Sequence, residues 1–196
     1  SLNDFDYLII GEGEKTFVEL LEYFEGKRKI NEIKGIIYKE QDKIIMTEPR
    51  PMLRPEELDE LPLPERKLLD LEKYTWSVPK KGIVKFTTLM TTRGCPFQCN
   101  FCSQRNVFGT SIRERNYKLV LDEIEYLVKE LKLNHFTFID DTLTLNKERT
   151  RKICEGIIER KVEITWEGFT RANTITEDLL QIMKKAGLVR ISFGIE

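Results

Sequence analysis

Three of the four cysteines lie close together, with the spacing Cys-x3-Cys-x2-Cys at Cys95, Cys99 and Cys102. Gly94 and Pro96 accompany them, and these two residue types favour a turn over a helix. Three thiolates from one short loop can ligate three irons of a cubic iron–sulfur cluster and leave the fourth iron open to an external ligand. The spacing therefore predicts a cluster at which chemistry can take place.

Two other interpretations of these cysteines remain open. Their spacing also fits one face of a helix, where they would form a buried stripe of small apolar side chains. A structural zinc site would need a fourth ligand, and neither His135 nor Cys154 has the paired spacing of a zinc knuckle. Cys154 lies near Ile153 and Ile157, so we expect a buried structural thiol there. Disulfides are not expected, because the chain shows no secretory segment.

The cysteine motif resembles that of the radical S-adenosylmethionine enzymes, Cys-x3-Cys-x-aromatic-Cys, with Phe101 at the aromatic position. The resemblance implies that Cys95, Cys99 and Cys102 hold a [4Fe–4S] cluster whose open iron binds the amine and carboxylate of S-adenosylmethionine. It also implies that Phe101 packs near the adenine. One electron would cleave this cofactor to methionine and a 5′-deoxyadenosyl radical, which attacks an unactivated carbon of a small-molecule substrate. An electron donor such as flavodoxin or ferredoxin is implied as well.

The composition is that of a folded protein with balanced charge. The chain has 32 basic and 33 acidic residues, so no net field favours nucleic acid or an anionic membrane as a partner. Hydrophobic residues make up 40% of the chain, and no apolar run reaches the roughly 18 residues of a membrane span. The reduced thiols and an oxygen-labile cluster both predict a reducing compartment, the cytoplasm.

Strand and helix patterns alternate in the second half of the chain and predict an α/β fold with a parallel sheet. Strand-like segments cover residues 83–90, 135–139, 164–169 and 189–193, and helices are expected from residue 116, from residue 146 or 147, and over 175–187. The resemblance implies that these are the first four strands of a partial (β/α) TIM-like barrel, over residues 82–196.

Polar residues follow each of the later strands, where a barrel places its active site. Asp140 and Asp141 follow the second strand, Arg171 and Asn173 the third, and Glu196 the fourth. The resemblance implies that all five bind the cofactor: an aspartate takes its amine, Arg171 its carboxylate or ribose, and Glu196 its ribose hydroxyls. Capping aspartates and a surface arginine are the structural alternatives.

The first residues predict a strand followed by a helix. Residues 6–10 form a short apolar run typical of a buried parallel strand, and Gly11 to Glu14 lead into a helix. On that helix we expect one apolar face, formed by Phe17, Leu20, Leu21 and Phe24. A dinucleotide-binding turn is a weak alternative, because Thr16 replaces the third glycine of its fingerprint.

This segment resembles the last strand, loop and helix of the cobalamin-binding domain found in one radical enzyme subclass. The resemblance divides the chain into three parts. Residues 1–28 are the C-terminal remnant of a Rossmann-like domain, and residues 29–81 are a β-hairpin over 33–48 with a proline-rich linker. The barrel segment begins at residue 82. Cobalamin is then a possible cofactor of the full-length protein.

Three functions remain open from the sequence. The first is a cobalamin-associated radical enzyme, such as a methyltransferase or cyclase. The second is a zinc-stabilised binding module without catalysis. The third is a radical methylthiotransferase or tRNA-modifying enzyme, although residues 1–94 lack the second cysteine trio of the methylthio type. Because the chain ends on a strand, we expect a fragment that is inactive in turnover and self-associates through an open barrel edge.

Overall fold

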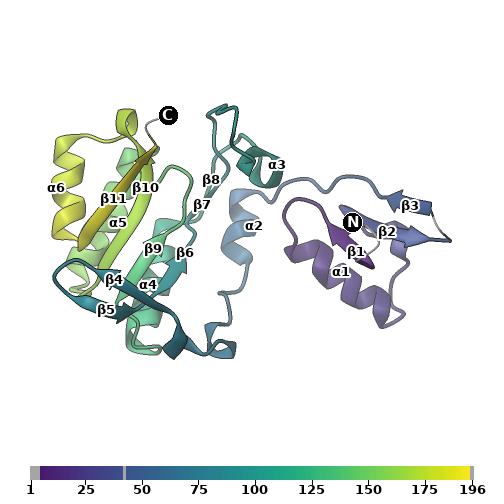
Figure 1. The fold of residues 1–196 in the computed structure, drawn as a ribbon, viewed down its shortest axis with the longest axis horizontal. Coiled ribbons are helices and arrows are strands. Elements are labelled where there is room, and N and C mark those ends of the chain that lie inside the picture. Colours follow the sequence, from purple (N-terminus) through teal and green to yellow (C-terminus); the bar gives the residue numbers. More distant parts are fainter. Residues whose placement is uncertain (1–4, 42, 195–196) are drawn as a thin grey trace. The chain divides into compact units, whose positions relative to one another are not determined.

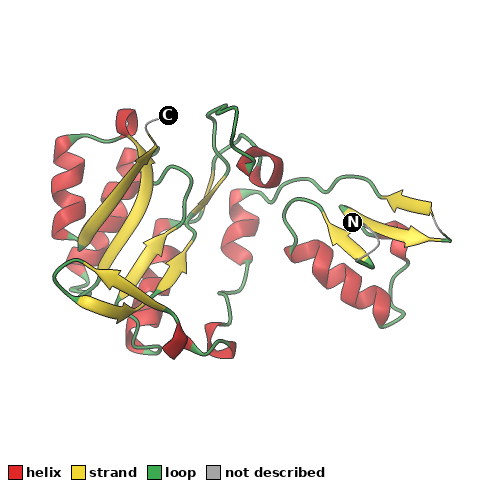
Figure 2. Ribbon diagram, viewed as in Figure 1, coloured by secondary structure: helices red, strands yellow, loops and turns green. Residues whose placement is uncertain are grey.

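The computed structural model describes residues 5–41 and 43–194, which form two compact units (Figure 1). One unit combines residues 5–54 with Gly94–Ser111, and the other combines Pro55–Arg93 with residues 112–194. These boundaries differ from the predicted division after residues 28 and 81. Figure 2 shows the helices and strands of both units.

The first unit contains a small antiparallel sheet in the order β1-β2-β3. Its elements are β1 (Tyr7–Ile9), α1 (Glu14–Phe24), β2 (Ile36–Glu40), β3 (Lys43–Met46) and α3 (Gln104–Phe108). The predicted hairpin is confirmed as β2 and β3. The expectation of a buried parallel strand is wrong, because β1 is half-buried and pairs antiparallel with β2. A short apolar run does not by itself fix the direction of its partner.

The apolar face of α1 is only partly used in this unit. Leu20 packs with Ile33, Ile36 and Tyr38 in a small core, while the other apolar side chains predicted for this face are exposed: Phe17, Leu21 and Phe24. A sheet of three short strands offers too little apolar surface to cover the whole helix face.

The second unit is an α/β structure around a parallel sheet in the order β11-β10-β9-β6. The sheet strands are β6 (Thr87–Leu89), β9 (His135–Phe138), β10 (Thr165–Arg171) and β11 (Leu188–Gly194). The connecting helices are α4 (Tyr117–Lys129), α5 (Lys147–Glu159) and α6 (Glu177–Lys185). The predicted parallel α/β sheet is confirmed. The sheet is open: within the described residues β6 and β11 do not pair, so no closed barrel is formed.

Asparagine caps begin two of these helices near the predicted residues. The Asn116 side chain accepts a hydrogen bond from the Lys118 N–H (3.0 Å), and the Asn146 side chain accepts one from the Arg149 N–H (3.1 Å). Each cap satisfies a backbone donor that the first helical turn leaves unpaired. The helices then pack their apolar stripes on one face of the sheet, with Phe136, Phe138 and Trp166 buried beneath them.

The predicted strand over residues 83–90 is wrong as a single element. It divides into β5 (Gly82–Lys85), which pairs antiparallel with β4 (Thr75–Val78), and β6, which pairs in parallel with β9. The division falls at Phe86, whose ring lies 5.3 Å from that of Trp76. The chain therefore exchanges one strand partner for another at this aromatic contact.

A short helix and a two-stranded ribbon also belong to the second unit. The proline-rich linker contains a helix, α2 (Pro55–Glu60), which begins at a proline, a residue tolerated in the first turn because that turn needs no N–H bond. A two-stranded ribbon of β7 (Thr92–Arg93) and β8 (Arg113–Glu114) flanks the cysteine loop in the chain.

Candidate functional site

The cysteine loop, residues Gly94–Ser111, leaves the second unit after β7 and returns to it at β8. Gly94 has a φ of +88°, and a Cβ atom there would lie 2.3 Å from the Ser111 carbonyl oxygen, so only glycine fits where the ends of the loop meet. Inside the loop the Cys95 N–H donates to the Gly109 carbonyl (3.3 Å), and the Cys102 N–H donates to the Cys99 carbonyl (3.1 Å).

The three loop cysteines fit the donor set of an iron–sulfur cluster. All are reduced and half-buried, and residues 95–102 are not helical, so the helical stripe is excluded for this loop. In the described part of the chain, no three His, Cys, Asp or Glu side chains are gathered into a metal site. The three thiols come from a single loop whose ends meet at Gly94, and three thiolates are the ligand set of a cubic cluster with one open iron. Phe101 is 70% exposed on this loop.

Cys154 contrasts with the loop cysteines and matches its prediction. It is buried within α5, and this burial raises the pKa of its thiol to about 12. Thiolate is the form that ligates metals. The side chain is therefore a structural thiol.

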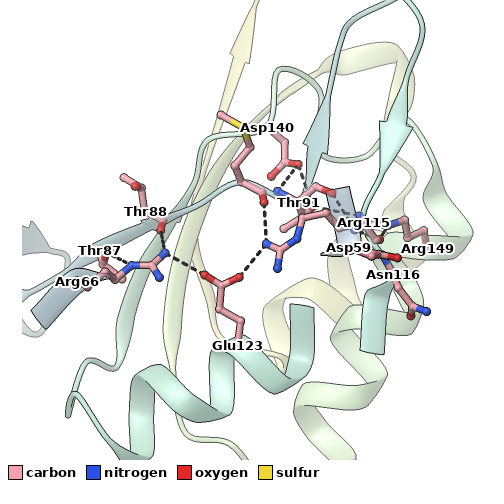
Figure 3. Close-up of polar contacts among 11 residues, drawn as sticks. Asp59, Arg66, Thr87, Thr88, Thr91, Arg115, Asn116, Glu123, Asp140 and Arg149 are labelled. Carbon is pink, nitrogen blue, oxygen red and sulfur yellow. Dashed lines mark hydrogen bonds and ion pairs between the residues drawn. The ribbon is translucent and has the colours of Figure 1, made fainter. Parts of the chain in front are cut away.

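Asp140 lies just beyond the carboxyl end of β9 and is 1% exposed. Its Oδ1 atom accepts three hydrogen bonds, from the Thr91 N–H (3.0 Å), the Thr91 hydroxyl (2.8 Å) and the Thr92 hydroxyl (2.6 Å). Its Oδ2 atom is buried without a hydrogen-bond partner among the described residues. The carboxylate thus joins the end of β9 to the chain segment that leads into the cysteine loop (Figure 3).

Arg149 of α5 approaches the same segment. Its guanidinium donates to the Thr91 hydroxyl (3.1 Å), to the Thr91 carbonyl (3.1 Å) and to the Arg115 carbonyl (2.8 Å). Burial raises the pKa of Asp140, an effect opposed by the threonine hydrogen bonds and by the positive charge of Arg149. Burial lowers the pKa of Arg149, and Asp140 opposes that shift. The two side chains compensate each other's buried charge.

A second ionic group holds the outer edge of β6. Glu123 of α4 is buried between Arg66, at 3.0 Å, and Arg115, at 2.7 Å. The Arg66 guanidinium also donates to the Thr88 carbonyl (2.9 Å), and the Arg115 guanidinium to the Met90 carbonyl (3.1 Å). Figure 3 shows Glu123 between its two arginines beside this strand. Three arginines, including Arg149, therefore bind consecutive parts of the segment before the cysteine loop.

The remaining predicted residues differ in position. Asp141 is half-buried next to Asp140, Arg171 is the half-buried last residue of β10, and Asn173 is exposed in the following 3₁₀ turn. Asp141 and Asn173 follow the carboxyl ends of sheet strands, as predicted, whereas β10 extends two residues beyond the predicted strand and includes Arg171. Glu196 lies outside the described residues.

A separate buried polar cluster occupies the amino end of β9. The His135 Nδ1 atom is hydrogen-bonded to the Thr165 hydroxyl of β10 (3.0 Å), and its Nε2 atom is buried without a partner in the described chain. Nearby, the Glu167 carboxylate accepts from Thr137 (3.2 Å) and pairs with Arg190 (3.3 Å). Burial lowers the pKa of His135, an effect that the Glu167 charge opposes.

Sequence reasoning missed Arg149 and Glu123, although both lie on the apolar stripes of their helices. Arg149 precedes Ile153 and Ile157 at steps of four residues, so it continues the buried stripe of α5. Glu123 occupies the stripe of α4 in the same way, between Val120 and Ile124. A charged residue on an apolar stripe is a signal of a buried ionic partner.

Comparison with known proteins identifies the family of this chain. The sequence profile of the Radical SAM superfamily matches residues 89–196, more than half of the chain. The chain belongs to the radical SAM superfamily. The matched region begins at the end of β6 and includes the cysteine loop, Asp140 and Arg171.

Curated relatives of this radical SAM chain are longer proteins. It is 38% identical over 191 residues to an uncharacterized methyltransferase of Pyrococcus horikoshii, a match that covers 97% of the chain and 40% of the relative. It is 34% identical to the anaerobic magnesium-protoporphyrin IX monomethyl ester cyclase of a Synechocystis species, covering 97% of the chain and 37% of that protein. The chain thus spans two fifths or less of these relatives.

Solved radical SAM structures share its fold. The methyltransferase TsrM from Kitasatospora setae, solved with tryptophan and a SAM analog, superposes with a TM-score of 0.78 at 19% identity, covering 97% of the chain and 37% of TsrM. The cobalamin-dependent enzyme OxsB, solved with aqua-cobalamin and S-adenosylmethionine, gives a TM-score of 0.77 at 23% identity, covering 95% of the chain and 27% of OxsB. Within the described residues of the present chain, no helix combines the length and apolarity needed to cross a membrane.

Proposed function

We propose that this chain is the cluster-binding part of a radical SAM enzyme, in which Cys95, Cys99 and Cys102 hold a [4Fe–4S] cluster. The observation that carries the proposal is the closed loop with three reduced, half-buried cysteines in a region that matches the superfamily. When bound, the reduced cluster supplies the electron that cleaves S-adenosylmethionine to methionine and a 5′-deoxyadenosyl radical.

The protein's own residues bind and orient the cofactor in this proposal. The Asp141 carboxylate accepts a hydrogen bond from the cofactor amine, and the Arg171 guanidinium donates to its carboxylate, a match of fork-shaped donor and paired acceptors. Phe101 packs against the adenine, and Asn173 and Glu196 bind polar groups of the cofactor. The exposure of Phe101 supports its role, since its ring surface is available to a ligand.

We assign the parallel sheet to the first four strands of a partial TIM-like barrel, and residues 1–28 to the end of a cobalamin-binding domain. The fold similarity to OxsB and TsrM supports both assignments. The reaction of the full-length protein is methyl transfer or cyclisation at an unactivated carbon of a small molecule, as the named relatives suggest. A flavodoxin or ferredoxin supplies the electron, and the open β11 edge pairs with a further strand or a second copy.

Anaerobic iron–sulfur reconstitution of the chain tests the cluster assignment. We expect about four irons per chain and, after dithionite reduction, an electron paramagnetic resonance (EPR) signal that changes when S-adenosylmethionine is added. Cys99→Ser should abolish the signal, because it removes one thiolate ligand.

Cys154→Ala is the matched control, since its thiol is buried and protonated. It should retain the iron and the signal. Equal iron content in Cys99→Ser and the wild-type chain, or uptake of zinc in place of iron, would contradict the proposal.

A further inference from the structure

We propose that Asp140 is a positioning residue that fixes the start of the cysteine loop and does not itself contact S-adenosylmethionine. The inference deepens the proposed function and rests on it. It separates the roles of two adjacent aspartates that sequence spacing treats alike.

The contacts of Asp140 are directed toward the protein. Its Oδ1 atom already accepts three hydrogen bonds from Thr91 and Thr92, and the side chain is 1% exposed. With three donors, Oδ1 has little remaining capacity for a cofactor amine, and Oδ2, which has no partner among the described residues, is buried out of reach of a ligand. Asp141, in contrast, is half-buried at the same strand end.

Thr91 is fixed from two directions at once. Its hydroxyl donates to Asp140 (2.8 Å) and accepts from Arg149 (3.1 Å), while its N–H and carbonyl bind the same two side chains. Every polar group of Thr91 is therefore engaged by the end of β9 or by α5. The side chain of Thr91 is fully buried as well.

The hydrogen bonds of Asp140 hold residues that immediately precede the cysteine loop in the chain. Thr92, the third donor to Asp140, is the first residue of β7, which pairs with β8 through Thr92–Glu114 and Arg93–Arg113. Gly94 follows β7 directly, and Cys95 follows Gly94. Asp140 thus fixes the ribbon from which the loop departs, and so acts on the cysteines through Thr91 and Thr92.

Asp140→Ala and Asp141→Ala, each reconstituted anaerobically in the full chain, separate the two roles. In Asp140→Ala we expect about tenfold faster amide hydrogen exchange at Thr91, because its N–H loses a charged acceptor. We also expect an altered EPR spectrum of the reduced cluster without cofactor, but an unchanged half-saturating concentration of S-adenosylmethionine. Asp141→Ala should leave the exchange and the cofactor-free spectrum unchanged and should weaken the cofactor-induced change.

The opposite pattern would overturn the proposal: normal exchange at Thr91 and a normal cofactor-free spectrum in Asp140→Ala, together with loss of the cofactor response. If Asp140→Ala does not fold, Thr92→Val and Thr92→Ser replace it. Thr92→Val removes one donor to Asp140 and should reproduce the spectral change, whereas Thr92→Ser keeps the hydroxyl and should match the wild type. Identical EPR spectra for Thr92→Val and Thr92→Ser would contradict the positioning role of Asp140.

Failure of the proposed function has a different signature. A wild-type chain that takes up no cluster would refute the cluster assignment. The exchange rate at Thr91 would still report whether Asp140 fixes the start of the loop.

Discussion

The two ends of β9 each bury a titratable side chain, and they compensate it differently. At the amino end, His135 bonds to Thr165 of the neighbouring strand, so the contact stays within the sheet. At the carboxyl end, Asp140 accepts three hydrogen bonds from the segment after β6, and Arg149 adds a positive charge from a helix. The amino end of the sheet is therefore internally cross-linked, whereas the carboxyl end holds the segment that bears the cysteine loop.

The two ends also respond to pH in opposite directions. Burial raises the pKa of Asp140 above 3.8, so its contribution to stability is present below that pH and is lost as the pH rises through the folded-state pKa. Burial lowers the pKa of His135 below 6.5, so its contribution is present above that pH and is lost as the pH falls. Mild acid therefore weakens the amino end, whereas the contribution of Asp140 grows as the pH falls.

Removing Arg149 from the carboxyl end of β9 should have the largest effect on the free energy of unfolding. Arg149→Met leaves the buried Asp140 without its cation and removes the guanidinium donors of the Thr91 and Arg115 carbonyls, so we expect the free energy of unfolding to fall by about 3–5 kcal/mol. Urea denaturation followed by circular dichroism measures it. Arg151→Met, on the same helix, removes only a surface pair with Asp178 and should cost less than about 1 kcal/mol. Similar costs for the two variants would show that the Arg149 network does not stabilise the fold.

Altering the amino end should have an intermediate effect. His135→Asn preserves a polar partner for Thr165 but loses ring volume, so we expect a cost of about 1–2 kcal/mol at pH 7. Because the wild type loses stability through His135 on acidification, the gap between the two proteins should narrow at pH 5. Urea denaturation at both pH values tests this. A gap that widens at pH 5 would reverse the assigned sign.

The smallest effect is expected from charge changes at the amino end, which shift the pKa of His135 and leave its side chain in place. Glu167→Gln removes the negative charge that supports the imidazolium form, so the pKa of His135 should fall further. The chain has a single histidine, so its imidazole resonance in a proton NMR titration needs no assignment. Arg190→Gln is the matched opposite, because that cation lowers the pKa of His135 and its removal should raise it. If both variants shifted the pKa of His135 in the same direction, the charges of Glu167 and Arg190 would not control that pKa.

Local patterns predicted the elements that local chemistry determines. The asparagine caps at residues 116 and 146, the apolar stripes and the turn-forming cysteine loop all follow from short-range preferences. The division at Phe86 does not, because it depends on two strand partners, β4 and β9, that compete for one apolar run. The pairing of Asp140 with Thr91 spans 49 residues, and no spacing rule connects them.

The arginines along β6 also determine which edge of the sheet can accept another strand. The Leu89 carbonyl accepts from Ile139 on the β9 side, so the carbonyls of Thr88 and Met90 face the outer edge, where Arg66 and Arg115 occupy them. An incoming strand would have to displace two guanidinium groups that share a buried carboxylate. In the described chain β11 pairs only with β10, so its outer edge still offers a template. A strand that joined this sheet would therefore pair with β11 and not with β6.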